Sequence, residues 1–224
     1  GEAHFHNLDG DEIEKQTTEI KWDAEAAEKA GFEHFMMKEI HEQPRAVKDT
    51  LNSVLKDGKI DLTDIGLAEE DIRRTSQIYI VACGSAYHVG MVAQYVIEDL
   101  VKIPVRVELA SEFRYRKPIL DPNGLVIIIS QSGETADSLA ALRETKAQGI
   151  RTLGIVNVVG SSIAREADKV FYTLAGPEIS VATTKAYSTQ LMASYILAIQ
   201  FAKVKNTITE EQYENYIAEL QAIP

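Results

Sequence analysis

Short, almost uninterrupted apolar runs alternate with helical stretches from Ser76 onward, and no other feature of the sequence restricts the fold as strongly. The runs predict five strands, at residues 78–82, 105–109, 125–130, 152–156 and 169–172. Helices are expected between and after them, at residues 87–100, 136–148, 163–167 and 184–204. Strands that have no polar face must be covered on both sides, which is typical of parallel sheets.

This pattern predicts an α/β fold: a three-layer, doubly wound, flavodoxin-like five-stranded parallel sheet with right-handed crossovers. The sheet domain is expected to span residues 69–219. Before it, residues 23–68 are expected to form an N-terminal helical extension, with a helical arm and a connection. The helical spacing covers residues 24–55, and Pro44 is expected to break this segment into two helices.

Composition and charge narrow the class of protein. The 224 residues carry a formal net charge of −11, which argues against nucleic-acid binding, because that depends on clustered Lys and Arg. The single Cys83 excludes an internal disulfide and suits a reducing compartment. The sequence has no basic and apolar leader, and its longest apolar helix is too short for a bilayer. We therefore expect a cytoplasmic protein that does not bind membranes.

Two turns rich in hydroxyl groups follow the first and third predicted strands. They read CGSAYH at residues 83–88 and SQSGET at residues 130–135. If the strand order is 2-1-3-4-5, both turns open onto the crevice where the order reverses, which is where such sheets bind ligands. Neither turn contains Lys or Arg, so an anion there would be held by backbone N–H groups, hydroxyls and a helix dipole.

The expected geometry of the second turn is specific. Ser132 as N-cap would place residues 133–135 in the first helical turn with free N–H groups, and Gly133 would let a ligand approach the backbone. Taken alone, the same turn is explained by a helix cap. The convergence of two such turns favours a phosphate site, and the missing nucleotide-binding glycine motifs argue against a nucleotide.

Other segments offer weaker signals. Thr183 or Thr184, in EISVATTKAY after the fifth strand, would cap the last long helix, and Ser161-Ser162 are interpreted as capping residues only. Cys83 is interpreted as a small apolar residue at a strand end. His34 and His41 are seven residues apart, but no ligand cluster accompanies them, so we expect no metal.

At these turns the sequence resembles the sugar isomerase (SIS) domain. More narrowly, it is similar to the first of two such domains in the isomerising glutamine–fructose-6-phosphate aminotransferases. SQSGET is typical of SIS domains in general, and KEIHEQP and SEFRYRKP indicate the aminotransferases. The matching segments are KEIHEQPRAV at 38–47, ACGSAYHVG at 82–90, ELASEFRYRKP at 108–118, SQSGETADSL at 130–139 and EISVATTKAYSTQ at 178–190.

The resemblance implies a site for fructose 6-phosphate or glucosamine 6-phosphate. Its phosphate-binding residues would be Ser130, Gln131, Ser132 and Thr135. Its sugar-binding residues would be Ser85, Val181 and Thr183. The sequence departs from the common Cys-Gly-Thr-Ser of the family, because Ser85 replaces Thr and Ala86 lacks a hydroxyl.

The resemblance also implies an organisation and an activity. Residues 1–22 would be a remnant of the glutaminase domain's C-terminal hairpin, with an Asp-Gly type I′ turn within residues 4–13, and residues 220–224 would begin a linker to a second SIS domain. The parent enzyme would make glucosamine 6-phosphate from fructose 6-phosphate and glutamine, without a cofactor or metal. Because the family's catalytic groups lie elsewhere, we expect no catalytic residue here and no activity of this chain alone. A homodimer is expected, through the early helices and the long last one. Other phosphosugar isomerases or deglycases, and non-catalytic phosphosugar sensors, are the alternatives.

Overall fold

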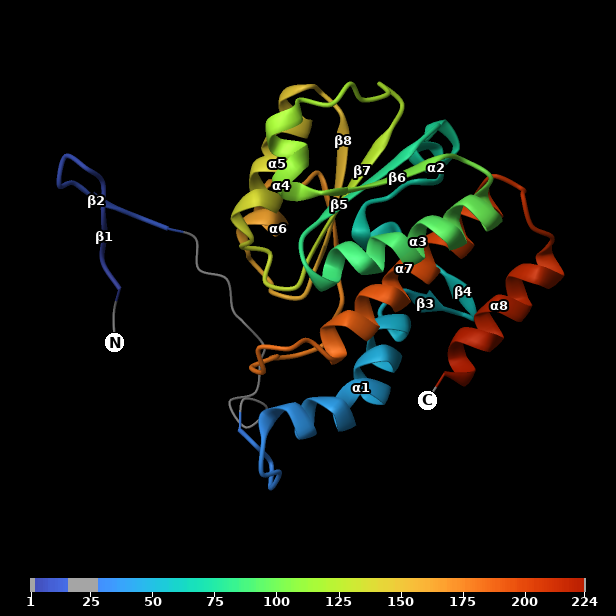
Figure 1. Cartoon of the computed structure of the whole chain (residues 1–224), viewed down its shortest axis with the longest axis horizontal. Coiled ribbons are helices and arrows are strands. Elements are labelled where there is room, and N and C mark those ends of the chain that lie inside the picture. Colours follow the sequence, from blue (N-terminus) through green and yellow to red (C-terminus); the bar gives the residue numbers. More distant parts are fainter. Residues whose placement is uncertain (1–2, 16–27, 224) are drawn as a thin grey trace.

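A five-stranded parallel sheet forms the centre of the molecule (Figure 1). The computed structural model of the protein describes residues 3–15 and 28–223. The strand order β6-β5-β7-β8-β9 corresponds to 2-1-3-4-5, so the predicted doubly wound sheet is confirmed. The strands are β5 (Ile78–Ala82), β6 (Val105–Leu109), β7 (Leu125–Ser130), β8 (Arg151–Val156) and β9 (Lys169–Tyr172). Four of the five predicted strands have the observed bounds, and the remaining one, β8, begins one residue earlier than expected.

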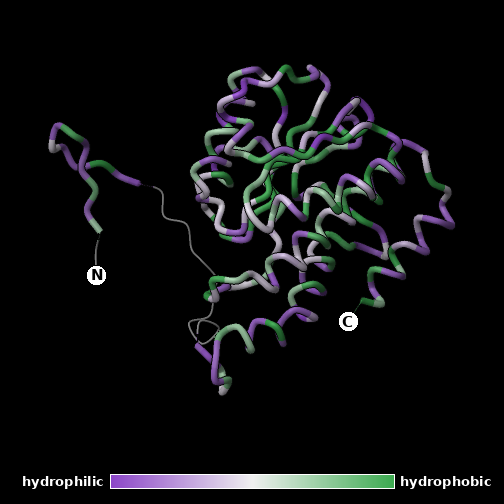
Figure 2. Tube along the Cα trace, in the orientation of Figure 1, coloured by the Kyte–Doolittle hydropathy of each residue, from purple (hydrophilic) through white to green (hydrophobic). Residues whose placement is uncertain are grey.

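Helices cover both faces of this sheet and create two apolar cores. On one face, α3 and α7 pack on alternate strand residues such as Ile80 and Ile127. On the other face, α4, α5 and α6 pack on the intervening residues, such as Val81 and Ile128. Every residue of β5 and β7 is buried, and these strands form the hydrophobic centre of the trace in Figure 2. The bounds are α3 (Ser85–Val101), α4 (Ala110–Arg116), α5 (Ala136–Ala147), α6 (Ser162–Glu166) and α7 (Lys185–Val204).

The long helix α7 lies between α3 and an outer layer that α1 (Phe35–Asn52) and the C-terminal helix α8 (Glu210–Ala222) form, which explains why it is apolar on most sides. It contacts α3 and α1 most extensively, and also α2 (Glu69–Arg74) and α8. Ile196 and Ala198 are completely buried on it. Burying a side chain the size of isoleucine contributes about 1.5–3 kcal/mol, so this helix is a main stabilising element. Within the described residues, no helix combines the length and the hydropathy needed to cross a bilayer.

The predicted break at Pro44 is wrong, because α1 (Phe35–Asn52) continues through it. Proline has no N–H, so the carbonyl of Ile40 loses its usual helical partner. The side-chain Nε2 of Gln43 donates to that carbonyl at 3.2 Å and compensates. The helix bends but does not end (Figure 1). It also begins later than predicted, at Phe35, and part of the predicted helix lies outside the described residues.

Several short elements were not predicted. The expected polar connection after α1 contains a small hairpin, a 3-10 turn and a helix. These are β3 (Leu55–Lys56), β4 (Lys59–Ile60), η2 (Thr63–Ile65) and α2 (Glu69–Arg74). Helices α4 and α8 were also missed, although Thr209 and Gln212 form a reciprocal capping box that the sequence TEEQ could have indicated.

The predicted N-terminal hairpin is present, but its turn differs. Strands β1 (Phe5–His6) and β2 (Glu12–Ile13) pair antiparallel, with His6 opposite Glu12. Residues 7–11 therefore form a longer loop, and the expected two-residue type I′ turn is wrong. The reason is Asn7, whose side-chain oxygen accepts the N–H groups of Asp9 and Asp11 at 3.0 and 2.9 Å. The expected domain boundary at residue 22 lies outside the described residues.

Candidate functional site

A cavity of about 400 Å³ lies at the carboxyl ends of β5 and β7, the point where the strand order reverses. It brings together residues from the turns after both strands and from the segment before α7. All seven residues predicted from the sequence line it, namely Ser85, Ser130, Gln131, Ser132, Thr135, Val181 and Thr183. Five further residues complete the lining: Cys83, Ala86, Ile129, Ala182 and Gln190.

The loop at residues 130–135 is organised by its own hydroxyl groups. Ser130 is buried at the end of β7, and its Oγ accepts the N–H of Gly133 at 3.1 Å. The same Oγ lies 3.0 Å from Oγ1 of Thr135. The Oγ of Ser132 accepts the N–H of Glu134 at 3.2 Å. These bonds fold the loop into a compact arch above the strand end.

The arch replaces the helical turn expected here. Helix α5 begins at Ala136 with Thr135 as its N-cap, so the prediction that Ser132 caps it is wrong. Gly133 has a φ of +67°, a left-handed conformation that a right-handed helical turn does not contain. The helix therefore starts three residues later than a Ser132 cap implies, and its free N–H groups lie just beyond the arch.

Hydrogen-bond donors nevertheless remain available to an anion. Within the described residues, the backbone N–H groups of Ser132 and Thr135 make no hydrogen bond. The hydroxyl of Ser132 acts as an acceptor, so its own proton is free. In the Ser130–Thr135 pair only one proton is shared, which leaves the other free. The first turn of α5 adds its partial positive charge. No Lys or Arg lines this cavity in the described part of the chain, so an anion would be bound by neutral donors.

Glu134 is the one charged residue of the arch, and its carboxylate is bound outside the cavity. It accepts the N–H of Ser162, the first residue of α6, at 2.7 Å. The hydrogen bonds from Ser162 lower the pKa of Glu134. Ser161 is the N-cap of α6 by position, as predicted, but its side chain makes no capping hydrogen bond, because the carboxylate of Glu134 caps this helix. Among the described residues its buried Oγ has no hydrogen-bond partner, and it lies instead against Gly133.

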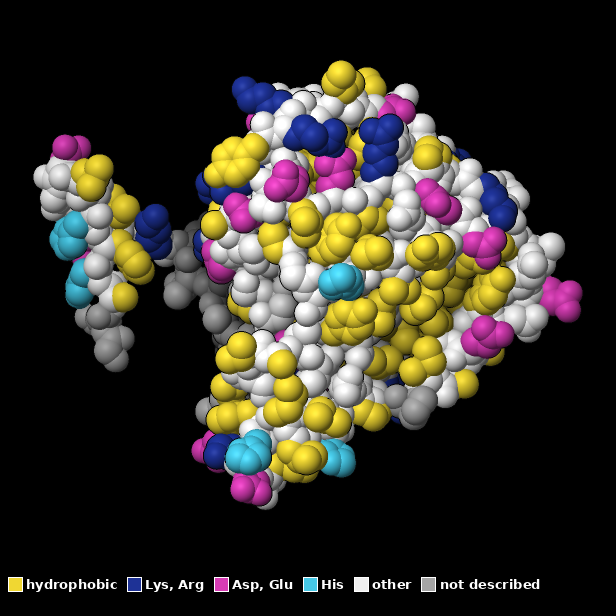
Figure 3. All heavy atoms as spheres, viewed as in Figure 1, with side chains coloured by type: hydrophobic (Ala, Val, Ile, Leu, Met, Phe, Trp, Pro, Cys, Tyr) yellow, Lys and Arg dark blue, Asp and Glu magenta, His cyan; other side chains and the backbone are white. Residues whose placement is uncertain are grey.

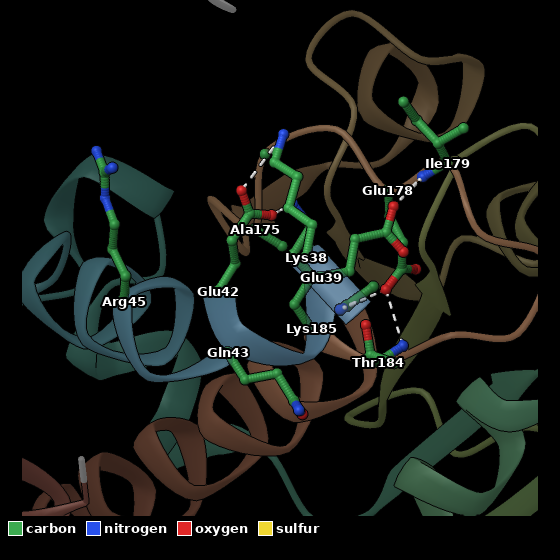
Figure 4. Close-up of polar contacts among 12 residues, drawn as sticks. Lys38, Glu39, Glu42, Gln43, Arg45, Ala175, Glu178, Ile179, Thr184 and Lys185 are labelled. Atoms are coloured by element: carbon green, nitrogen blue, oxygen red, sulfur yellow. Dashed lines mark hydrogen bonds and ion pairs between the residues drawn. The ribbon is translucent and has the colours of Figure 1, made fainter. Parts of the chain in front are cut away.

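The opposite wall is formed by Val181, Ala182 and Thr183. Thr183 donates its hydroxyl proton to Oε2 of Glu178 at 3.0 Å. Oε1 of Glu178 accepts the N–H groups of Thr184 and Ala186 at 2.9 and 3.1 Å. Thr184 is the N-cap of α7 by position, but Glu178 provides the capping side chain (Figure 4). Because the proton of Thr183 is committed to Glu178, this hydroxyl presents an acceptor to the cavity.

The family model of the SIS domain matches residues 71–200, which include both turns of the cavity. The chain belongs to the SIS domain family. It is 56% identical to the glutamine--fructose-6-phosphate aminotransferase [isomerizing] of Clostridium acetobutylicum over 223 residues, covering 99% of this chain and 37% of that protein. The corresponding protein of Methanosarcina acetivorans is 46% identical, covering 99% of this chain and 36% of that protein. The chain thus spans little more than a third of these relatives.

Solved structures agree with this assignment. The C-terminal domain of glucosamine-fructose-6-phosphate aminotransferase from Francisella tularensis superposes with a TM-score of 0.84 at 47% identity, covering 87% of this chain and 55% of that chain. The predicted resemblance to the SIS portion of these aminotransferases is therefore confirmed. The sugar isomerase domain of the RpiR transcription factor from Sphaerobacter thermophilus shares the fold at 17% identity, with a TM-score of 0.60, covering 84% of this chain and 98% of that chain. The SIS fold alone thus does not separate enzymes from regulators.

One polar residue of this SIS domain was missed from the sequence. Gln190 lies on α7, is only 3% exposed and lines the cavity. Within the described residues its side-chain amide makes no hydrogen bond, so its donors and acceptor are open to a ligand. An amide on a largely buried helix was the available signal. Cys83 is a half-buried free thiol that lines the cavity, and the described residues contain no cluster of metal-ligating side chains.

Proposed function

We propose that this SIS domain is the first of two in a glutamine–fructose-6-phosphate aminotransferase, and that it binds fructose 6-phosphate. The parent enzyme would form glucosamine 6-phosphate and glutamate from fructose 6-phosphate and glutamine. One observation carries the proposal: a single cavity contains all four predicted phosphate residues and all three predicted sugar residues. The similarity to aminotransferases over nearly the whole chain supports it.

In this proposal the arch binds the phosphate. The N–H groups and hydroxyl protons of Ser132 and Thr135 donate to its oxygens, and Gln131 contributes its amide. The dipole of α5 stabilises the negative charge. At the opposite wall Thr183 accepts a hydrogen bond from a sugar hydroxyl, and Gln190 can both donate and accept. Val181 provides apolar contact to the carbon skeleton.

The lining also explains why we expect no activity from this chain alone. Ketose isomerisation moves a proton between neighbouring carbons and requires a general base or acid. Among the described residues that line the cavity there is no Asp, Glu, His, Lys or Arg. The acid and base would come from the part of the relatives that this chain does not span. We therefore assign binding and orientation to this domain, without a metal or cofactor.

We further propose a cytoplasmic homodimer that associates through α1 and α7. An apolar groove between these helices is lined by Ile40, Pro44, Val47, Leu191 and Met192. It continues into apolar surface over α3, α7 and α8, where hydrophobic side chains gather in Figure 3. Buried against a second copy, such a surface would stabilise association.

Calorimetry of this chain with fructose 6-phosphate, and with fructose as the phosphate-free control, tests the binding proposal. Thr135→Val keeps the side-chain volume and removes the hydroxyl. Hydrogen bonds to charged groups contribute about 1.5–3 kcal/mol, so affinity should fall roughly 10- to 100-fold. Ser76→Ala removes a hydroxyl that donates to Asp121 outside the cavity, and it should leave affinity unchanged. Equal binding of fructose and fructose 6-phosphate, or no effect of Thr135→Val, would contradict the proposal. Glucosamine 6-phosphate formed by this chain from glutamine would contradict the predicted inactivity.

A non-catalytic phosphosugar sensor is the second candidate. The absence of acid and base groups from the described cavity lining favours it, because a sensor needs only binding. Another phosphosugar isomerase or deglycase would need the same binding residues. The parent gene distinguishes these candidates: a glutaminase domain indicates the aminotransferase, and a helix-turn-helix segment indicates the sensor.

A further inference from the structure

We propose that Glu39, on α1, is a positioning residue for the sugar side of the cavity, which it shapes together with Glu178. This inference rests on the proposed function, because it concerns how the same site recognises the sugar. Neither carboxylate lines the cavity itself. Both act on the segment between β9 and α7, which carries Val181, Ala182 and Thr183.

Glu39 is a buried carboxylate with an unusual set of partners. It is 1% exposed and accepts the N–H of Ile179 at 2.6 Å. The N–H of Ser180 lies 3.2 and 3.3 Å from its two oxygens. In the described part of the chain no Lys or Arg forms an ion pair with it, so backbone N–H groups alone balance its charge. Burying a carboxylate costs several kcal/mol unless it is well bonded, so these contacts fix the loop firmly to α1.

Glu178 fixes the other end of the same wall. It accepts bonds from Thr183, Thr184 and Ala186, as described above. Glu39 therefore holds residues 179–180 by hydrogen bonds, and Glu178 holds Thr183, Thr184 and Ala186 in the same way. Only Val181 and Ala182 remain between the two held segments, and these two residues line the cavity together with Thr183. Glu39 and Glu178 together determine where this short wall stands and which way the hydroxyl of Thr183 points.

A layer of charged residues holds α1 close enough for Glu39 to reach the loop. Lys185, 2% exposed in the first turn of α7, donates to Glu42 at 2.7 Å. The Nζ of Lys38 lies 3.5 Å from the same carboxylate. Figure 4 shows these side chains beside α1, with Glu39 directed at Ile179 and Glu178 at Thr184. The segments KEIHEQP and EISVATTKAY are thus joined in one network that reaches the cavity wall.

The two halves of the site should respond differently to a change at Glu39. The phosphate donors lie on the arch, which is held by its own serines and by α5. The sugar contacts of Val181 and Thr183 lie on the wall that Glu39 holds. Weakening Glu39 should therefore reduce affinity for a sugar phosphate and leave affinity for inorganic phosphate unchanged.

Glu39→Gln is the test, because glutamine has the same shape but offers one acceptor oxygen where the carboxylate has two. Binding of fructose 6-phosphate and of inorganic phosphate is followed by amide NMR titration, at a temperature where every variant is folded. We expect fructose 6-phosphate to bind about tenfold more weakly, inorganic phosphate to bind as before, and the Ile179 and Ser180 amide signals to move.

Asp168→Asn is the matched control. Asp168 also joins two segments by accepting an N–H and a hydroxyl, both from Thr152, at 2.9 and 2.8 Å. It lies before β9, at the end of the sheet away from the cavity. Its substitution should lower stability without changing either affinity.

The outcomes separate the two claims. If the unaltered chain binds neither probe, the proposed function fails and the inference fails with it. If the unaltered chain binds both probes and Glu39→Gln binds fructose 6-phosphate equally well, the inference alone is wrong. It is also wrong if both probes lose affinity together, or if Asp168→Asn reproduces the selective loss.

Discussion

Substituting Gly133 with alanine should destabilise the protein by two separable effects. The residue has a φ of +67°, and a side chain in that conformation costs about 1–2 kcal/mol. The new Cβ would also stand 2.1 Å from Oγ and 2.6 Å from Cβ of Ser161. Overpacking of this kind costs about 1–3 kcal/mol. The sum is about 2–5 kcal/mol, a large part of the roughly 5–15 kcal/mol that stabilises a typical domain.

Urea and thermal unfolding measure this loss, and a matched glycine separates its two parts. Gly149 has a φ of +72°, but no atom lies within 4 Å of the position that a Cβ would occupy there. Gly149→Ala should therefore cost only the backbone strain, about 1–2 kcal/mol. A loss of about 3 kcal/mol for Gly133→Ala corresponds to a fall in melting temperature of roughly 6–12 °C for a chain of this size.

Removing the neighbour tests the steric part directly. Ser161→Gly deletes both atoms that the new Cβ would meet, and glycine at an N-cap costs only a few tenths of a kcal/mol. The double variant Gly133→Ala/Ser161→Gly should therefore be more stable than Gly133→Ala. If Gly133→Ala were no less stable than Gly149→Ala, or if Ser161→Gly gave no recovery, the packing of the arch against Ser161 would be refuted.

Two further predictions concern polar groups near the site. Gln190→Leu should weaken fructose 6-phosphate binding about tenfold in calorimetry. It should not lower the melting temperature, because the amide of Gln190 has no hydrogen-bond partner among the described residues. Unchanged affinity would show that Gln190 does not contact the ligand. Glu134 has a pKa below its ordinary 4.5, so its ionised form stabilises the folded chain above that pH, and this contribution disappears as the pH falls through the folded-state value. Glu134→Gln should therefore reduce the unfolding free energy at pH 7 and have progressively less effect below pH 4.5; an effect of equal size at every pH would contradict this explanation.

The sheet and the location of the candidate site were predictable from the sequence because both depend on local signals. Strands such as Leu125–Ser130 are apolar throughout and end sharply at a turn, which limits their possible bounds. The carboxyl ends of parallel strands must share one edge, so the two hydroxyl-rich turns were bound to converge. The resemblance then indicated individual residues, and all of them line the cavity.

Details that depend on distant contacts were not predictable in this way. The capping role expected of Ser132 failed because Gly133 is left-handed and packs against Ser161, 28 residues later in the sequence numbering. Glu39 meets Ile179 across a separation of 140 residues, and no local pattern encodes that contact. Pro44 was expected to break the helix in two. The side chain of Gln43 replaces the hydrogen bond that Pro44 cannot donate, and this side-chain conformation cannot be read from the sequence.

The neutral lining of the cavity has a kinetic consequence. A sugar phosphate is a dianion near neutral pH, and a chain with a net charge of −11 repels it at a distance. Attraction begins only within the reach of the amide and hydroxyl dipoles, a few ångströms from the arch. Dissolved ions screen the long-range repulsion and barely affect the short-range contacts. Capture of the proposed ligand should thus become faster as ionic strength rises, the reverse of what is expected at sites that attract phosphate with lysine or arginine.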